Sequence, residues 1–133
     1  MKQYLLDSNI CIYFLNDQFG IKTKIEEVGD EACFISEITL AELKFGAENS
    51  SSKAKNRQRV EQLASQFATI PISEVLDVYA REKARLRQAG TPVDDFDLLI
   101  GATAVHHQMV MVSRNVKHLS RIDGIELENW VSE

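Results

Sequence analysis

The opening stretch of this 133-residue chain decides its fold, and it runs Lys2-Gln-Tyr-Leu-Leu-Asp-Ser-Asn-Ile-Cys-Ile-Tyr-Phe-Leu15. The residues Lys2 to Leu6 predict a short strand. Asn9 to Leu15 predicts a helix that is apolar on nearly all sides, and Asp7 stands between the two elements. A strand that passes directly into a largely apolar helix is typical of a parallel sheet covered by helices.

The same alternation of short strands and helices continues along the chain. We expect further strands at Ala32 to Ile35, Thr69 to Ile72, Met109 to Val112 and Ile125 to Leu127. Helices are expected at about Gln18 to Val28, from a Ser36 cap to about Glu48, at Lys53 to Phe67, from a Ser73 cap to about Ala89, and at Asp94 to His106. Because no linker divides the sequence, we predict a single α/β domain over residues 1–133, with a short parallel sheet flanked by helices on both faces.

The composition excludes a membrane protein and favours the cytoplasm. Apolar residues make up 44% of the chain and charged residues 26%, as in an ordinary globular protein. No apolar run approaches the roughly 20 residues that span a bilayer, and the N-terminus lacks the layout of a signal peptide. Cys11 and Cys33 stand in apolar surroundings, so we expect reduced core residues and no disulfide.

Three carboxylates occupy positions where a globular domain would rather place apolar side chains. Asp7 follows an apolar strand, while Glu42 and Asp97 each lie on the apolar stripe of a predicted helix. An acid in apolar surroundings loses solvation and persists only if its charge is compensated. No lysine or arginine occupies a matching position, so the economical explanation is a shared divalent cation held by oxygen ligands.

The order of the elements lets these acids meet at one edge of the sheet. Ligand sites in parallel sheets gather beyond the carboxyl ends of the strands, where Asp7 and the segment from Ser113 to Asn115 are expected. Glu42 and Asp97 fall one or two turns into helices that could lean over the same edge. Mg²⁺ or Mn²⁺ among such acids suits phosphodiester hydrolysis, because the ion neutralises phosphate oxygens and lowers the pKa of a bound water.

Five segments carry motifs, at residues 5–13 (LLDSNICIY), 35–47 (ISEITLAELKFGA), 90–104 (GTPVDDFDLLIGATA), 112–115 (VSRN) and 124–130 (GIELENW). In order and spacing they resemble the sequence blocks of PIN-domain ribonucleases, and most closely those of the VapC toxins of bacterial toxin–antitoxin pairs. Each block alone is weak evidence, but together they cover essentially the whole chain. The resemblance implies a metal-dependent endoribonuclease with a PIN fold.

The resemblance also assigns roles to individual residues. It implies that Asp7, Glu42 and Asp97 bind the metal and act in catalysis, and we place Ser8 and Ser113 beside these acids in supporting positions. Asn115 is predicted to be catalytic, because it stands where many members of the family have a fourth acid. Other members of the family have that acid slightly later, where this chain has His118. We therefore expect one tightly held metal ion in the free protein.

The partners follow from the same resemblance. Members of the family are held inactive by a VapB antitoxin, and many cut structured RNA, including tRNA; those that look most like this chain act on initiator tRNA. We expect an antitoxin segment in an apolar groove around Ile10, Tyr13 and Phe14, because this stretch is more apolar than one helix face needs. We also expect a homodimer and no membrane partner.

The net charge of −5 argues against binding nucleic acid by overall charge, so local cations must meet the phosphates. Arg114, between two residues of the expected site, is the leading candidate for an RNA contact. Two alternatives stay open: a catalytically silent PIN-like module that only binds a partner, and a DNA-directed nuclease. A haloacid-dehalogenase-like enzyme is disfavoured, because it would need a second acid at the place of Asn9.

Other polar residues near these motifs have simpler interpretations. Asp94 and Asp95 fall in the first turn of a predicted helix, where acids cap free N–H groups and favour the helix dipole. His106, His107 and His118 show no spacing or partner typical of a metal site, so we expect surface or helix-end positions for them.

Overall fold

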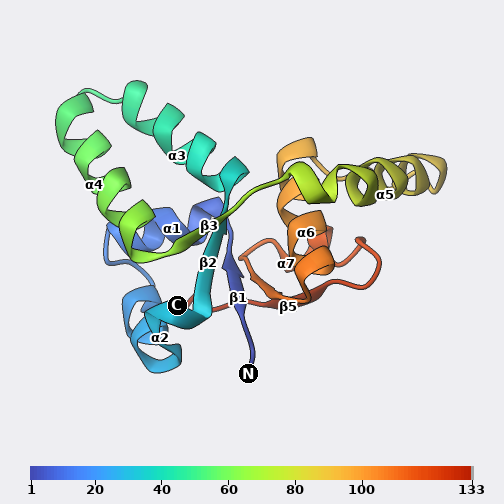
Figure 1. Ribbon diagram of the computed structural model, residues 1–133, viewed down its shortest axis with the longest axis horizontal. Helices are drawn as coiled ribbons and strands as arrows, with labels where there is room; N and C mark the ends of the chain where they lie inside the picture. Colours follow the sequence, from blue (N-terminus) through green and yellow to red (C-terminus); the bar gives the residue numbers. More distant parts are fainter. Residues whose placement is uncertain (133) are drawn as a thin grey trace.

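A computed structural model describes residues 1–132 of the chain. Within that range, five strands form one parallel sheet in the order β3-β2-β1-β4-β5 (Figure 1). The strands are β1 (Tyr4–Leu6), β2 (Cys33–Ser36), β3 (Ala68–Ile70), β4 (Val110–Val112) and β5 (Glu126–Glu128). The predicted α/β fold with a short parallel sheet is therefore confirmed.

Helices connect the strands and cover both faces of the sheet. Figure 1 places α1, α2 and α4 on one side of the strands and α5, α6 and α7 on the other. The elements are α1 (Ser8–Leu15), α2 (Ile21–Val28), α3 (Glu37–Glu48), α4 (Lys53–Gln66), α5 (Leu76–Gln88), α6 (Asp95–His107) and α7 (Val116–Leu119), with 3-10 turns η1 (Asp30–Ala32) and η2 (Ser73–Val75).

Two hydrophobic cores lie on opposite faces of the sheet, and the alternation of side chains in the strands produces them. Successive residues of a strand point to opposite faces. Leu6 packs in one core with Ile10 of α1, while Leu5 packs in the other with Ile100 of α6 and Met111 of β4. All of these side chains are completely buried. The central strand β1 is therefore apolar at every core position until it ends at an acid.

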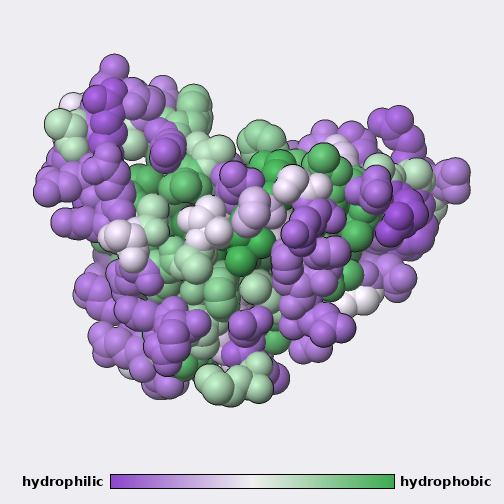
Figure 2. Space-filling view, viewed as in Figure 1, coloured by the Kyte–Doolittle hydropathy of each residue, from purple (hydrophilic) through white to green (hydrophobic). Residues whose placement is uncertain are grey.

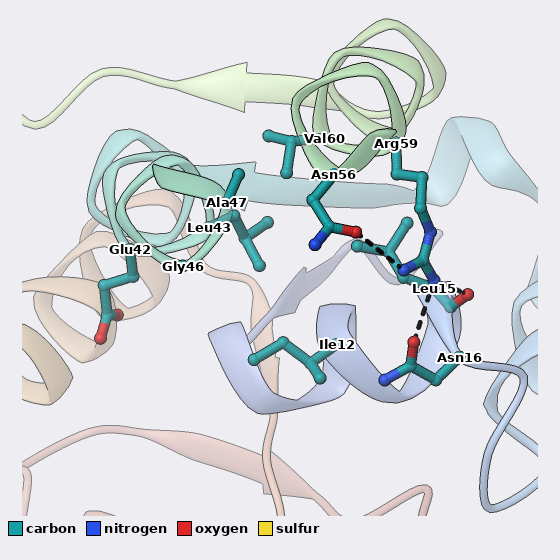
Figure 3. A pocket seen from close by; sticks show the side chains of 10 residues that line it. All are labelled: Ile12, Leu15, Asn16, Glu42, Leu43, Gly46, Ala47, Asn56, Arg59 and Val60. Carbon is teal, nitrogen blue, oxygen red and sulfur yellow. Dashed lines mark hydrogen bonds between the residues drawn. The ribbon is translucent and has the colours of Figure 1, made fainter. Parts of the chain in front are cut away.

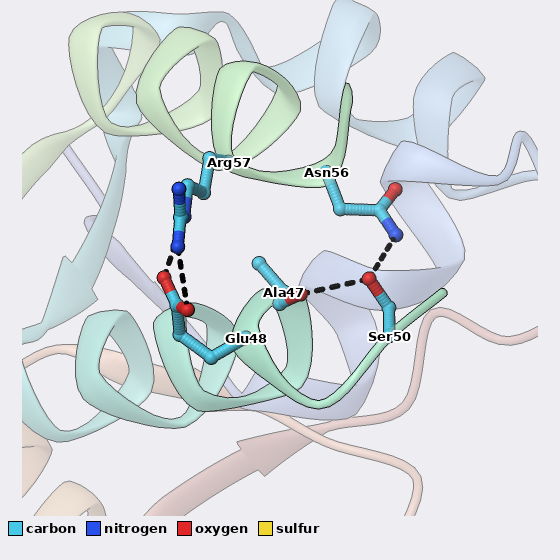
Figure 4. Close-up of polar contacts among 5 residues, drawn as sticks. All are labelled: Ala47, Glu48, Ser50, Asn56 and Arg57. Atoms are coloured by element: carbon cyan, nitrogen blue, oxygen red, sulfur yellow. Dashed lines mark hydrogen bonds and ion pairs between the residues drawn. The ribbon is translucent and has the colours of Figure 1, made fainter. Parts of the chain in front are cut away.

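The α3–α4 hairpin is closed by polar contacts around its short loop (Figure 4). Arg57 of α4 binds both carboxylate oxygens of Glu48, with its Nε 2.5 Å and its Nη2 2.7 Å from them. Ser50 donates to the Ala47 carbonyl oxygen (2.7 Å) and accepts from Asn56 Nδ2 (2.9 Å). These bonds satisfy polar groups at the end of α3 and set the direction in which α4 leaves the loop.

The structure differs from the sequence prediction mainly in its shortest elements. Ser73 begins the turn η2 and caps no helix, and α5 starts only at Leu76 without a side-chain cap. The last strand is shifted by one residue, to Glu126–Glu128, and the short helix Val116–Leu119 was not predicted. Elements of three or four residues carry no usable hydrophobic period, so neighbouring strands and helices determine their bounds.

The length of the helices and the burial of the cysteines are two further features of the described chain. Within residues 1–132, no helix is both long and apolar enough to cross a membrane. Cys11 and Cys33 are buried free thiols, and burial raises the pKa of the Cys33 thiol to about 12. Both cysteines therefore serve as core residues, as predicted.

Hydrophilic side chains gather over α4 and α5 at the two ends of the face seen in Figure 2, with hydrophobic residues between them.

Candidate active site

Asp7 lies at the carboxyl end of the central strand β1, where α1 begins. Its backbone N–H donates to the Val112 carbonyl oxygen of β4 (3.0 Å), so the two strand ends are held side by side. The Asp7 side chain is only 5% exposed, and the Ser113 hydroxyl donates to its Oδ2 at 2.6 Å. Burial raises the pKa of the Asp7 carboxyl, while the hydrogen bond from Ser113 acts in the opposite direction.

Glu42 approaches the same edge of the sheet from α3. That helix begins at Glu37, after Ser36 caps it by accepting a hydrogen bond from the Ile38 N–H (3.0 Å), as predicted. The Ser8 hydroxyl donates to Glu42 Oε1 at 2.6 Å, and Thr39 Oγ1 lies 3.3 Å from the Ser8 oxygen. Ser8, the neighbour of Asp7, therefore ties α1 to the acid on α3.

Thr39 is a supporting residue that was not predicted from the sequence. Its side chain is completely buried beside Ser8. It precedes Glu42 by three residues, a spacing that puts both side chains on one face of α3. That spacing was the only feature of the sequence that pointed to a supporting role for Thr39. A single threonine on a partly apolar stripe is, however, also common as an ordinary core residue.

Asp97 completes the cluster from the first turn of α6. Asp94 caps this helix as predicted, because its Oδ2 accepts from the Phe96 N–H at 3.2 Å. Burial raises the pKa of Asp97 to about 6, and the negative charges of Asp7, Asp94 and Glu42 contribute to the rise. Such charge effects fall with distance, so Asp7 and Glu42, which come from two other segments, lie near enough to Asp97 to raise its pKa. The joint binding of one ion by the three acids stays a prediction.

The residues that follow β4 form a hydrogen-bonded chain that leads to Asp7. Ser113 Oγ donates to Asp7 and accepts from the Asn115 backbone N–H at 3.0 Å. The Asn115 side-chain oxygen lies 2.8 Å from His118 Nδ1, which donates to it when the proton is on that nitrogen. Both Asn115 and His118 are exposed. Asn115 therefore stands at the rim of the cluster, and its catalytic role stays a prediction.

Arg114 packs against aromatic side chains of the α1–α2 region. Its guanidinium carbon lies 5.1 Å from the ring centre of Phe19 and 6.0 Å from that of Tyr13, and Nη1 donates to the Tyr13 hydroxyl at 3.3 Å. These contacts hold an exposed cation beside the strand end that carries Ser113. The predicted contact of Arg114 with RNA stays a prediction.

The donor atoms of the cluster fit a hard divalent cation. Asp7, Glu42 and Asp97 offer carboxylate oxygens, which are the ligands that Mg²⁺ and Mn²⁺ prefer. Within residues 1–132, no lysine or arginine forms an ion pair with any of the three. Asp95, in contrast, is neutralised by Lys83 at 2.8 Å. The charge of the three clustered acids is thus left for a cation to compensate.

An apolar groove of about 610 Å³ runs beside the cluster. It is lined by Ser8, Asn9, Ile12, Ala41, Glu42, Leu43, Phe45 and Phe96. Ile12 is 41%, Phe96 49% and Phe45 67% exposed, which is unusual for such large apolar side chains. A smaller pocket of about 210 Å³ continues from it between α1, α3 and α4, and shares Ile12, Glu42 and Leu43 with the groove (Figure 3).

The residues predicted around the antitoxin groove do not line this one, and Ile10 is contradicted outright. Ile10 is completely buried in the core. Tyr13 packs edge-on against Phe19 with ring centres 4.7 Å apart, and Phe14 packs against Phe67 at 5.5 Å. The exposed apolar side chain of α1 is Ile12, because the other apolar positions of this short helix face the core.

Comparisons with known proteins place the chain in a family. The PIN domain model matches residues 4–125. Ribonuclease VapC2 of Rickettsia felis is 32% identical over 131 residues, which cover 96% of this chain and 97% of that protein. The tRNA(fMet)-specific endonuclease VapC of Salmonella typhimurium is also 32% identical, over 132 residues that cover 98% and 99% of the two chains. The chain therefore belongs to the PIN-domain family.

A solved structure shows the same architecture. The crystal structure of DNA-bound VapBC from Salmonella typhimurium contains a chain that is 31% identical to this one. The two superpose with a TM-score of 0.90, and the match covers 98% of this chain and 99% of the other. The similarity extends over both sides of the sheet, so the whole described chain is one PIN fold.

Proposed function

We propose that this protein is an endoribonuclease toxin that uses Mg²⁺ or Mn²⁺ to hydrolyse phosphodiester bonds in RNA. The observation that carries the proposal is the electrostatic coupling of Asp97 to Asp7 and Glu42, together with the hydrogen bond from Ser8, the neighbour of Asp7, to Glu42. Burial raises the pKa of both Asp7 and Asp97. Structural carboxylates are normally paired with cations, and these three have no such partner among the described residues. The ribonuclease names of the relatives support RNA as the substrate.

In this proposal the three acids bind the ion, and hydrogen bonds from nearby residues orient the acids. A bound Mg²⁺ or Mn²⁺ would neutralise phosphate oxygens and lower the pKa of a water molecule. The hydrogen bonds from Ser113 to Asp7 and from Ser8 to Glu42 keep the two carboxylates in one orientation. The Asn115 amide, which contacts His118 at the rim, would contact a phosphate group of the RNA. Arg114 would attract the RNA backbone.

We further propose a tRNA substrate, with initiator tRNA as the first one to test. The support is the name of the Salmonella typhimurium relative, a tRNA(fMet)-specific endonuclease. We also propose a cytoplasmic location, because tRNA is found in the cytoplasm. The expected homodimer stays a prediction.

A VapB-like antitoxin is the proposed partner, and the apolar groove is its proposed docking site. The solved relative is a VapBC structure, which supports such a partner. The groove shares Ser8 and Glu42 with the acidic cluster, so a segment bound in it would lie beside the acids. Occupation of the groove would keep RNA away from the cluster and hold the enzyme inactive.

The decisive experiment measures cleavage of tRNA, unstructured RNA and DNA by the purified protein, with matched variants of one helix. Asp97→Asn removes an acid of the cluster, whereas Asp94→Asn removes a neighbouring negative charge and keeps a side chain that can cap α6. We expect a loss of at least about 100-fold for Asp97→Asn and a minor loss for Asp94→Asn, since only the first removes a metal ligand. Cleavage should stop after chelation and return with Mg²⁺ or Mn²⁺.

The alternatives predict different outcomes of the same experiment. Cleavage that persists after thorough chelation would reject the metal-dependent mechanism. Cleavage of DNA with RNA left intact would identify a DNA-directed nuclease. A protein that binds its antitoxin but cleaves no nucleic acid would be a silent binding module; the exposed groove alone is compatible with that function, but the presence of all three acids favours the enzyme.

A further inference from the structure

The carboxyl end of α6 carries a second group of side chains with metal-ligating atoms. His106 and His107 are the last two residues of that helix, and Glu74 belongs to the turn η2. One donor atom from each of the three side chains lies within 4.8 Å of the other two. His106 follows Asp97 by nine positions, so it lies about 14 Å farther along the helix axis. The group is therefore separate from the acidic cluster.

Direct contacts join these three side chains. His106 Nε2 lies 3.5 Å from Glu74 Oε2. The two imidazole rings meet edge-on, with centres 4.9 Å apart and planes at 90°. Both histidines lie at the end of α6, as predicted, but the sequence could not foresee that η2 folds back onto this end and brings Glu74 to His106. The partner is more than 30 residues away along the chain.

One nitrogen of this group lacks a hydrogen-bond partner in the described part of the chain. His107 Nε2 is buried, and among the atoms of residues 1–132 it has no hydrogen-bond partner. A buried polar nitrogen is disfavoured without a donor or acceptor. A metal ion bound through His107 Nε2 would satisfy this nitrogen. This observation is independent of the spacing of the three donor atoms.

The donor atoms and their surroundings select the kind of ion. Two imidazole nitrogens and one carboxylate oxygen suit Zn²⁺ and similar transition-metal ions, whereas Mg²⁺ prefers oxygen ligands alone. Zinc ligands at about 2.1 Å from the ion stand roughly 3.4 Å from one another, so donor atoms that lie within 4.8 Å of one another need to approach by at most about 1.4 Å. The side chains of Glu74 and His106 are 68% and 37% exposed and are free to do so. The C-terminal end of a helix also attracts a cation.

We propose that Glu74, His106 and His107 form a binding site for a transition-metal dication of the Zn²⁺ class, with water completing the coordination. The site joins η2 to the end of α6, two segments that already pack together. A bound ion therefore stabilises this side of the domain. The site is independent of the proposed nuclease activity, because it contains none of the three clustered acids.

The test uses the full chain with Asp7→Asn and Asp97→Asn, so that the acidic cluster no longer competes for metal. Zn²⁺ is titrated by calorimetry, and the imidazole protons are followed by NMR. We expect one Zn²⁺ per chain, a raised melting temperature, and no response to Mg²⁺ at the same concentration. His106→Gln and Glu74→Gln should each weaken Zn²⁺ binding by about tenfold or more, since each removes one of three ligands.

His118→Gln in the same background is the matched control, because His118 is an exposed histidine outside the group. It should leave the Zn²⁺ affinity unchanged. Equal Zn²⁺ binding by the parent protein and the His106→Gln and Glu74→Gln variants would overturn the proposal, as would loss of binding in His118→Gln alone. His107→Gln is a supplementary variant; if it fails to fold, the two variants at exposed positions decide the question.

Discussion

At the residue scale, Asp7 and Asp97 are distinguished by the direction in which their pKa values shift. An exposed acid with a cationic partner shows the opposite behaviour: the hydrogen bond from Arg57 lowers the pKa of Glu48. For Asp7 and Asp97, burial is the largest effect, and it raises both pKa values. Raised carboxyl pKa values in a group of like charges are typical of sites that bind cations or exchange protons.

Asp97 should make the stability of the metal-free protein depend on pH. Its pKa is about 6 in the folded chain against an ordinary 3.8, so the folded state binds more protons between about pH 4 and pH 6. Stability contributed by the protonated form is therefore lost as the pH rises through this window. We expect an effect on the order of 1 kcal/mol, reduced by the partial exposure of the side chain.

Urea unfolding across this pH range checks the expectation. The wild-type free energy of unfolding should decline relative to that of Asp97→Asn as the pH rises, since the amide does not titrate. Parallel pH profiles for the two proteins would contradict it. Affinity for Mn²⁺ should change in the other direction and increase up to about pH 6, because the ion binds the ionised carboxylate.

Ser113 is expected to support metal binding through Asp7. Ser113→Ala removes the hydroxyl that donates to Asp7 Oδ2 and leaves the carboxylate buried with less support. We expect Mn²⁺ affinity to fall by about tenfold or more, as for other residues that orient a metal ligand. Calorimetric titration provides the measurement. Ser120→Ala is the control, because the exposed hydroxyl of Ser120, just after α7, donates to the Lys117 carbonyl oxygen. Equal effects of the two substitutions would refute the role.

At the element scale, α4 is held against the end of α1 by one arginine. The Arg59 guanidinium donates to the Leu15 carbonyl oxygen and to Asn16 Oδ1, the latter at 2.9 Å (Figure 3). The last carbonyl groups of a helix lack partners within the helix and carry partial negative charge. Arg59 satisfies one of them and places its own positive charge beside it. The walls of the smaller pocket therefore depend on this contact.

Arg59→Ala should lower the free energy of unfolding by about 1.5–3 kcal/mol, the range for hydrogen bonds that involve a charged group. Arg57→Ala is a matched control on the same helix. The pair of Arg57 with Glu48 is exposed, and exposed pairs contribute little. Urea denaturation of both variants provides the comparison. If the two lose the same stability, the contact between α4 and α1 has no special importance.

At the scale of the whole molecule, the groove should govern binding of the antitoxin. Phe45 is 67% exposed within the groove, and Leu76 is 50% exposed at the start of α5 outside it. Phe45→Ser should weaken binding of the cognate antitoxin by about tenfold or more, because a large apolar side chain in an interface often contributes over 1 kcal/mol. Leu76→Ser should leave it unchanged. A binding assay in which both variants match the wild type would exclude this groove.

The local elements and the identity of the acids were determined by the sequence alone. The apolar run at Tyr4–Leu6 and the helical stripes in α3 and α6 are visible without coordinates, because positions that face the core carry apolar side chains. Asp7, Glu42 and Asp97 were recognisable since each stands at a position where apolar residues are expected. The parallel sheet followed from the alternation of strands with helices.

Only the tertiary structure decided which distant residues touch. The hydrogen bond between Ser113 and Asp7 spans 106 positions, and the contact between Glu74 and His106 joins a turn to the end of a helix. The exposure of Ile12 beside the buried Ile10 was equally inaccessible to the sequence. A hydrophobic period defines the faces of one element, whereas a contact or groove between elements depends on their relative placement, which the packing of the whole core determines.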